Sequence, residues 1–391
     1  MTESRPGARL VPRQILVRGV NWLGDAAMTT PALQRLREGL PDASITLLSP
    51  QKLADLWLHC AYFDQVITFG PDETPWSIGR RLRTESFDTF LVLPNSPRSA
   101  LEGWFARIPE RIGFARPWRN WLLTQPVASR PGRQLMRKRS PGEIHRLTRG
   151  GQSQSNVRRY RPSATPAAHQ MNEYLHLVSQ LGANPAPIDP SLSVHPEETI
   201  AAITKFGLNR EAAGKSVLGL NPGAEYGPAK RWPLDKFIQT ASEVQKRANC
   251  VWLIFGAQSD LRLANQIEAA LRSPHSAIRN LAGKTSLREL MALLKGCRAL
   301  LTNDTGPMHV AAAIGTPVIV PFGSTSPELT GPGLCGVGHD YLFASDVPCA
   351  PCFRRTCPID LRCMNAITVE IVAGAMLEAL GSATKPVQRQ K

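Results

Sequence analysis

Short apolar runs alternate with segments of helical spacing through the first half of the chain. A short apolar run is typical of a buried strand, and apolar residues every three or four positions are typical of a helix with one buried face. The predicted strands are 14–18, 44–48, 65–69, 89–93 and a short edge strand at 111–114. The predicted helices are 26–39, 52–60, 75–84 and 170–181. This alternation predicts a doubly wound parallel sheet.

The same alternation starts again after a proline-rich stretch at 185–196, which is typical of a linker. Strands are predicted at 216–220, 250–255, within 278–283, at 299–301 and at 318–320, and helices at 233–248, 261–271, 286–295 and 310–314. Ser286 and Glu289 form a capping-box pattern at one helix start. We therefore predict an α/β fold of two Rossmann-like domains facing a cleft. The predicted boundaries are an N-terminal domain at 1–184, a linker and entry segment at 185–215 and a C-terminal domain at 216–391.

Residues 129–168 interrupt the pattern, because they lack apolar periodicity and are rich in Arg, Ser, Gly, Pro and Gln. The net charge of the chain is +15, and ten Lys/Arg against one acid between 129 and 165 supply nine of those charges. We predict a flexible basic insertion in the N-terminal domain that favours an anionic surface. Binding of single-stranded nucleic acid favours interleaved aromatic residues, whereas Tyr160 is the one aromatic residue in this segment.

The apolar fraction of 42% is ordinary for a globular protein, and no apolar stretch is long enough to span a membrane. The polar start of the chain does not resemble a secretory signal, so a cytoplasmic location is the default expectation. Five of the eight cysteines lie close together near the C-terminus: Cys335, Cys349, Cys352, Cys357 and Cys363. The last four have spacing that suits a structural zinc site, although only one C-x-x-C pair is present. A reduced, packed loop and a local disulfide remain open alternatives, and we assign no metal.

A polar segment from Thr302 to His309 follows the apolar run 299–301 and precedes an alanine-rich helix that Gly315 ends. In open α/β sheets, ligands bind at the carboxyl ends of the strands. The first turn of a helix offers free N–H groups and a positive dipole end, which suit a phosphate. The crowding of Asp304, Thr305, Gly306 and His309 into one turn favours a binding site over an ordinary capped crossover.

Two further loops follow strands in the second half. In the loop 221–232, Gly223 allows close backbone approach, and Lys230 and Arg231 can meet a phosphate. In the loop 255–260, Asp260 can accept hydrogen bonds from ribose hydroxyls, or it can cap the following helix. Together the three loops predict a pocket for a nucleoside diphosphate, although none is a Walker loop or a G-x-G-x-x-G fingerprint.

Gly24-Asp25 stands at a strand-to-helix turn in the first half. A carboxylate placed there can take a proton from an attacking hydroxyl, which is the task of a general base. The alternative is that Asp25 only caps the helix that begins at 26. The sequence leaves these two interpretations open.

Three ordered motifs carry a family resemblance: Asn21-Trp22-Leu23-Gly24-Asp25, Lys230-Arg231-Trp232-Pro233 and Asn303-Asp304-Thr305-Gly306-Pro307-Met308-His309. They resemble the ADP-heptose:lipopolysaccharide heptosyltransferases of glycosyltransferase family 9. The N-W-L-G-D start and the tail with Cys349, Cys352 and Cys357 look most like the heptosyltransferase II branch. The resemblance covers nearly the whole chain except 129–168.

The resemblance implies a GT-B fold, an acceptor-binding N-terminal domain and a C-terminal domain for ADP-L-glycero-D-manno-heptose. It implies an inverting transfer without metal or cofactor, with Asp25 as the base and Lys230 neutralising the leaving diphosphate. The implied donor-binding residues are Gly223, Glu225, Tyr226, Asp260, Asp304, Thr305, Gly306 and His309. Glu225 and Tyr226 depart from the hydroxyl residues that related heptosyltransferase I enzymes carry there. The implied acceptor-binding residues are Asn21, Trp22 and Gly24.

The implied acceptor is the lipopolysaccharide inner core (lipid A–Kdo–heptose), modified on its first heptose. Peripheral contact with the cytoplasmic face of the inner membrane follows, and no nucleic acid is expected. Two other functions compete: a GT-B nucleotide-sugar epimerase, and a non-enzymatic anion- or nucleic-acid-binding protein that uses the basic insertion. An epimerase would need further acid/base groups in the cleft, and it would act on the nucleotide sugar without an acceptor.

Overall fold

The computed structural model describes residues 13–149, 156–160, 167–209, 212–272, 277–333 and 340–382. Two compact units divide the chain. The first comprises the described residues within Met1–Asn21, Thr29–Pro131 and Asn172–Ala186. The second comprises those within Trp22–Met28, Gly132–Met171 and Pro187–Lys391. The short segment Trp22–Met28 therefore belongs by its contacts to the second unit. Cys335 and parts of 129–168 lie outside the described residues.

The first unit is built on a parallel sheet with strand order β3-β2-β1-β4-β5-β6. Its strands are β1 (Gln14–Arg18), β2 (Ser44–Pro50), β3 (Gln65–Phe69), β4 (Thr89–Val92), β5 (Glu110–Phe114) and β6 (Gln125–Val127). Its helices are α1 (Leu23–Gly39, shared with the second unit), α2 (Pro75–Leu82), α3 (Pro97–Phe105) and α5 (Met171–Val178). Short 3₁₀ turns are η1 (Gln51–Trp57), η2 (Arg83–Glu85), η3 (Asn120–Leu122) and η4 (Ser179–Leu181). This strand order is that of the dinucleotide-binding doubly wound fold.

The second unit repeats the same order, β10-β9-β8-β11-β12-β13, and adds β7 antiparallel at the edge. Its strands are β7 (Val157–Tyr160), β8 (Ser216–Asn221), β9 (Cys250–Ile254), β10 (Ala277–Asn280), β11 (Ala299–Thr302), β12 (Val318–Phe322) and β13 (Tyr341–Ser345). Its longer helices are α4 (Pro141–Thr148), α6 (Pro196–Lys205), α7 (Leu234–Arg247), α8 (Leu261–Leu271), α9 (Leu287–Gly296), α10 (Gly306–Ala313) and α13 (Val369–Ser382). Shorter turns are η5 (Pro228–Lys230), η6 (Gln258–Asp260), α11 (Pro327–Thr330) and α12 (Arg362–Asn365).

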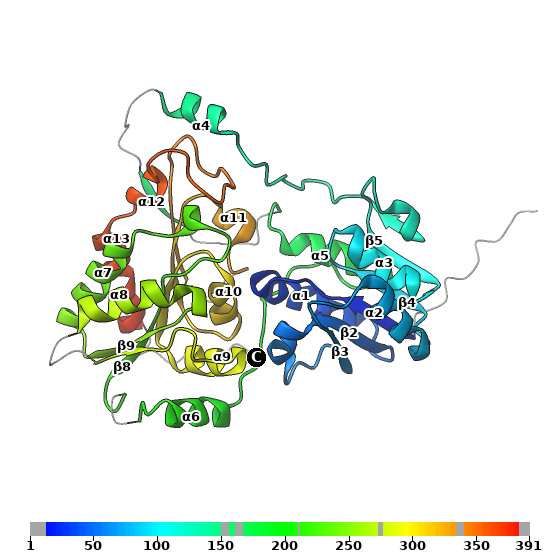
Figure 1. Cartoon of the computed structure of the whole chain (residues 1–391), viewed down its shortest axis with the longest axis horizontal. Helices are drawn as coiled ribbons and strands as arrows, with labels where there is room; N and C mark the ends of the chain where they lie inside the picture. Colours follow the sequence, from blue (N-terminus) through cyan, green and yellow to red (C-terminus); the bar gives the residue numbers. More distant parts are fainter. Residues whose placement is uncertain are drawn as a thin grey trace, which may run out of the picture. The chain divides into compact units, whose positions relative to one another are not determined.

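Helices cover both faces of the second sheet (Figure 1). Helix α7 packs against α8 and α13, and α9 packs against α6 and α10. Burial on both faces explains why β9, β11 and β12 read as continuous apolar runs, since every residue of these strands is buried. Two α/β units with doubly wound parallel sheets confirm the predicted fold class.

Most predicted elements are present within one to three residues of their expected limits. The capping box at α9 is confirmed, because Ser286 Oγ accepts from Glu289 N and Glu289 Oε2 accepts from Ser286 N. Gly315 follows α10 with φ of +85°, as expected of a helix stop. Two expectations were wrong. Residues 52–60 contain the 3₁₀ turn η1 rather than an α-helix, and β5 is not an edge strand, because β6 pairs with its outer side.

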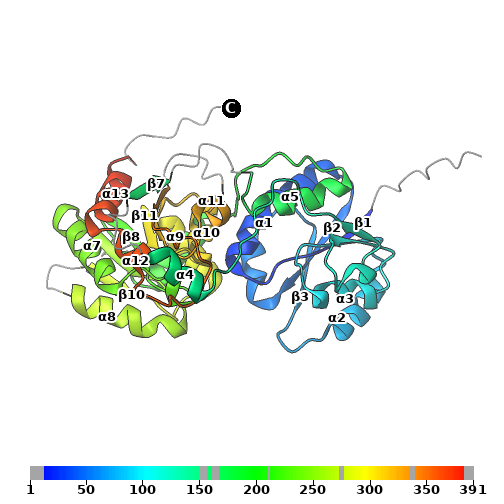
Figure 2. The same ribbon diagram turned by 90° about the horizontal axis from the view of Figure 1, so that it is seen from above.

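The described part of 129–168 also differs from the flexible insertion expected in the N-terminal domain. Helix α4 buries Ile144 in the core of the second unit. Strand β7 pairs with β13 and lies close to α13 (Figure 2), where Arg159 forms an ion pair of 2.9 Å with Glu378. Backbone pairing with an existing sheet edge does not require apolar periodicity, so the composition alone did not reveal this strand.

None of the described helices is long and apolar enough to cross a membrane.

Candidate active site

The strand order of the second unit reverses between β8 and β11, which run side by side and parallel. The loops that leave adjacent strands at such a point diverge and open a crevice at the carboxyl edge of the sheet. The loop after β8 is 222–233, and the loop after β11 is 303–305. These loops contain most of the residues predicted to bind a nucleoside diphosphate.

Asn303 fastens the two loops together. Its side chain is completely buried, and Nδ2 donates to the carbonyl oxygens of Pro222 at 2.8 Å and Gly223 at 3.3 Å. Its Oδ1 accepts from Trp232 N at 2.9 Å. Asn303 belongs to one of the three motifs, but it was not among the site residues predicted from the sequence. Its position directly after a buried strand was the signal that it serves the loops.

Asp304 and Lys230 form a close ion pair, with Lys230 Nζ at 2.7 Å from Asp304 Oδ2. Thr325 Oγ1 donates to the same oxygen at 2.5 Å. The ammonium also lies 5.1 Å from the centre of the Tyr226 ring, a distance suited to a cation–π contact. Lys230 therefore stands in a defined position at the crevice. Thr325, which follows β12, was not identified from the sequence.

Helix α10 begins at this crevice, with Thr305 as its N-cap residue and Pro307 in its first turn. Thr305 and Gly306 are half-buried, and a Cβ on Gly306 would lie 3.0 Å from the Cβ of Leu23. The small residue therefore permits close packing beside the helix start. The leading N–H groups of a helix have no partner within it, so this end of α10 can donate to an anion.

His309 lies on α10 and is buried. Burial is the main cause that lowers the pKa of His309 to about 4, so the imidazole is neutral at physiological pH. Its Nδ1 has no hydrogen-bond partner among the described residues. A Cβ on Gly24 would lie only 2.7 Å from His309 Cδ2, so only glycine fits at position 24 without a shift of the ring.

Asp25 lies in the first turn of α1, which begins two residues earlier at Leu23. It is therefore not the N-cap residue of that helix, which was the alternative interpretation of the sequence. Gln170 Nε2 donates to Asp25 Oδ1 at 3.2 Å. Burial raises the pKa of Asp25 to about 6, while Gln170 and the charge of Lys230 partly oppose the increase. A carboxylate with this pKa is ionised at neutral pH and remains basic enough to accept a proton.

A pocket of about 240 Å³ lies among the three predicted loops of the second unit. Asp260 lines it, accepts from Ala257 N at 3.1 Å and has Arg231 at 3.8 Å. The carboxylate thus holds its own loop while facing the pocket. Asp260 is the N-cap residue of α8, but its side chain makes no capping hydrogen bond to that helix, so the side-chain cap predicted as the alternative is not formed. A Cβ on Gly223 would lie 2.4 Å from Asp260 Oδ2, so glycine is required at this close approach.

Glu225 and Tyr226 have different surroundings. Glu225 is exposed and lines the pocket. The Tyr226 hydroxyl donates to Phe353 O at 2.7 Å, and the Arg355 guanidinium lies 5.3 Å from the ring centre. Tyr226 therefore links the loop after β8 to the cysteine-rich tail. The tail also supports Ala229, whose N–H donates to Arg355 O at 2.9 Å.

The cysteine-rich tail has four thiols around one small cavity, from Cys349, Cys352, Cys357 and Cys363. All four are free thiols, and burial raises the pKa of Cys363 to about 12. Within the described ranges, no group of three or more His, Cys, Asp or Glu side chains is arranged to hold a metal ion.

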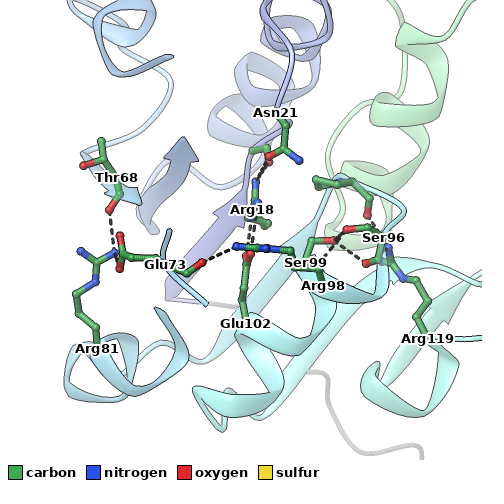
Figure 3. Close-up of polar contacts among 12 residues, drawn as sticks. Arg18, Asn21, Thr68, Glu73, Arg81, Ser96, Arg98, Ser99, Glu102 and Arg119 are labelled. Atoms are coloured by element: carbon green, nitrogen blue, oxygen red, sulfur yellow. Dashed lines mark hydrogen bonds and ion pairs between the residues drawn. The ribbon is translucent and has the colours of Figure 1, made fainter. Parts of the chain in front are cut away.

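Asn21 belongs to the first unit, where Arg18 Nη1 donates to its Oδ1 at 3.1 Å (Figure 3). Arg18 is buried and pairs with the buried Glu102 at 2.6 Å. Its guanidinium also lies 4.4 Å from the centre of the Phe69 ring. Because breaking a buried ion pair is costly, this pair gives the turn after β1 a rigid base. Trp22, the next residue, has 51% of its surface exposed.

The structure of Escherichia coli ADP-heptose lps heptosyltransferase II is similar to this chain, with a TM-score of 0.74 and 27% sequence identity. The match covers 95% of this chain and 100% of that one. The two doubly wound units and the crevice at β8 and β11 together define a glycosyltransferase of GT-B architecture.

Sequence comparisons identify the family. A model described as glycosyltransferase family 9 (heptosyltransferase) matches residues 143–362. Lipopolysaccharide heptosyltransferase 2 of Salmonella typhimurium is 32% identical over 326 residues, which cover 82% of this chain and 85% of that protein. The protein of the same name from Escherichia coli K12 is 31% identical with the same coverage. The chain belongs to glycosyltransferase family 9.

Proposed function

We propose that the chain transfers L-glycero-D-manno-heptose from ADP-heptose to the first heptose of the lipopolysaccharide inner core. The similarity to heptosyltransferase 2 proteins, which extends over most of the chain, supports this proposal most strongly. In the second unit, a lysine, a helix N-terminus and a half-buried carboxylate lie together. These groups suit transfer from a nucleoside diphosphate sugar.

In the proposed reaction, an acceptor hydroxyl oxygen forms a bond to the anomeric carbon of the heptose on the face opposite the diphosphate. The bond between that carbon and the diphosphate oxygen breaks, and ADP leaves with the electron pair. Asp25 takes the hydroxyl proton. The stereochemistry inverts because the displacement occurs in one step.

The leaving diphosphate gains negative charge as the bond breaks, and preorganised donors stabilise that charge. We assign this task to Lys230 and to the N–H groups at the start of α10, with Thr305 and Gly306. Asp304 and Thr325 would hold Lys230 in place. His309 would pack against the Asp25 turn, while Asp260 and Gly223 would contact the nucleoside. The first unit would bind the acceptor through residues that include Asn21, and Trp22 of the adjoining segment would also contact it.

The test is incubation of the purified protein with ADP-heptose, with and without a lipopolysaccharide acceptor that ends at its first heptose. We expect ADP release only with the acceptor, and a mass gain of one heptose on the product. Turnover of ADP-heptose to another sugar nucleotide without acceptor would support the epimerase instead. No turnover of either kind would contradict the proposal.

We also propose peripheral contact with the cytoplasmic face of the inner membrane, through exposed tryptophans of the first unit. Trp118 and Trp121 are 82% and 66% exposed, and the Trp121 ring lies 6.1 Å from that of Trp104. Tryptophan favours the membrane–water interface. Arg116, two residues before Trp118, adds a half-buried positive charge that favours anionic lipids. The basic segment is a weaker candidate, because Arg137 and Arg159 already pair with glutamates.

This contact predicts that the protein co-sediments with vesicles containing phosphatidylglycerol more than with phosphatidylcholine vesicles, and less as salt rises. The double variant Trp118→Ser/Trp121→Ser should lose most of that binding. The control is Trp76→Ser, another exposed tryptophan of this unit. Equal binding by the double variant and the unaltered protein would contradict the assignment.

A further inference from the structure

Gln170 lies in a turn that two hydrogen bonds anchor to the segment at the end of α11. Its own N–H donates to Leu329 O at 3.0 Å. The ring of the preceding His169 is buried, with Nε2 at 3.1 Å from Gly331 O. The N–H of Met171 donates to His169 Nδ1 at 3.2 Å. The turn is therefore held by three hydrogen bonds around one residue.

The neutral ring of His169 preserves the hydrogen bonds of this turn as pH changes. Because Nδ1 accepts from Met171, the ring proton is on Nε2, which donates to Gly331 O. Burial lowers the pKa of His169 below its usual value, so the ring is neutral at neutral pH. The backbone that carries the Gln170 side chain is therefore expected to keep the same conformation across the neutral pH range.

From this turn the Gln170 amide reaches Asp25 Oδ1 at 3.2 Å. A donor that bonds a carboxylate favours its ionised form. The charged groups that act on Asp25 are Lys230, which favours the ionised form, and Asp304, which disfavours it. His309, which contacts the neighbouring glycine, is neutral. Gln170 is thus an uncharged group that lowers the pKa of Asp25 and partly opposes the increase caused by burial.

We propose that Gln170 is a positioning residue for heptose transfer, which holds Asp25 ionised and aimed by binding Oδ1. The other carboxylate oxygen, Oδ2, then receives the proton of the acceptor hydroxyl. This inference rests on the proposed function of Asp25 as the general base. It adds to the site a residue that none of the three sequence motifs contains.

The test is the pH dependence of kcat/KM for heptose transfer, whose acid limb reports the ionisation of the essential base. Gln170→Leu removes the donor, so the limb should move to higher pH by about one unit, and kcat/KM at the acid end should fall roughly tenfold more than at pH 8. Gln170→Lys places a cation beside the carboxylate, so the limb should move about one unit to lower pH.

Gln180→Leu is the matched control, because within the described part of the chain Gln180 donates to groups of its own helix end, His176 O and Ser179 Oγ. Its acid limb should match that of the unaltered protein. If the acid limb of the pH profile is unchanged in both Gln170 variants and their thermal unfolding is normal, the proposal for Gln170 is overturned. The transferase function is not affected by that result. A shift of the same size in Gln180→Leu would overturn the proposal for Gln170 as well. If the unaltered protein transfers no heptose, the proposed function itself fails.

Discussion

Replacing Asp25 by asparagine should lower kcat for heptose transfer by ~10²–10⁴-fold, the usual contribution of a general base. Asparagine has the same size but cannot take the proton of the acceptor hydroxyl. Folding should survive, because Asp25 is the third residue of α1 and not its cap. The lost interaction with the helix dipole amounts to only about 0.3–1 kcal/mol. Binding of ADP-heptose should remain close to normal.

The measurement is kcat with the lipopolysaccharide acceptor, beside thermal unfolding and donor binding by calorimetry. Asp235→Asn is a matched control, since Asp235 also lies in the first turn of a helix, α7, and is not among the site residues. It should keep normal kcat. An Asp25→Asn enzyme with near-normal turnover would remove Asp25 from its assigned role.

The raised pKa of Asp25 gives the same assignment a pH signature. Only the ionised carboxylate accepts a proton, and burial raises its pKa to about 6. Activity should therefore increase as pH rises through about 6 and level off above it. An acid limb near pH 4, the value for an ordinary aspartate, would contradict this environment for the base.

Replacing Lys230 by alanine should reduce kcat by ~10²–10³-fold, comparable to the loss of one donor to a developing oxyanion. The effect falls mainly on kcat because charge on the leaving diphosphate grows as the bond to the sugar breaks. Alanine also leaves the buried Asp304 without its cation, so a lower unfolding temperature should accompany the loss. Lys230→Arg, which retains the charge, should preserve more activity and more stability.

The measurement separates kcat from ADP-heptose affinity and compares both with Lys205→Ala. Lys205 also forms an ion pair, with Glu289 at 2.5 Å, but this pair is more exposed and Lys205 lies on α6 rather than in the crevice. Its loss should leave kcat unchanged. If Lys230→Ala keeps the turnover of the unaltered protein, the leaving-group role belongs to another group.

Local patterns in the sequence were sufficient for most of the fold. A strand buried on both faces needs a continuous apolar run. For this reason β9, β11 and β12 could be predicted from their own sequences, without knowledge of the strands they pair with. The three loops of the crevice were also predictable, because each combines polar residues and glycine directly after such a run. Right-handed connections limit the possible strand orders. The order itself came from the structure, because more than one doubly wound order satisfies that rule.

Elements that depend on distant partners were not predictable in this way. Strand β7 exists because the edge of β13 offers unpaired backbone groups, and its own sequence is basic with no apolar pattern. Strand β6 has three residues and forms by pairing with β5. In both cases the hydrogen bonds to another strand supply the stability that composition lacks.

The candidate site likewise has features that local sequence predicts and features that depend on distant partners. The sequence by itself determined the identities and local positions of Asp25, Lys230, Asp304 and His309, since these follow from motifs within single loops. Only the tertiary structure decided their partners: Gln170 for Asp25, and Thr325 for Asp304. It also decided that α1 begins before Asp25 and that burial raises the pKa of this carboxylate. Burial and hydrogen bonding at a site arise from residues far apart in the chain, and no local pattern records them.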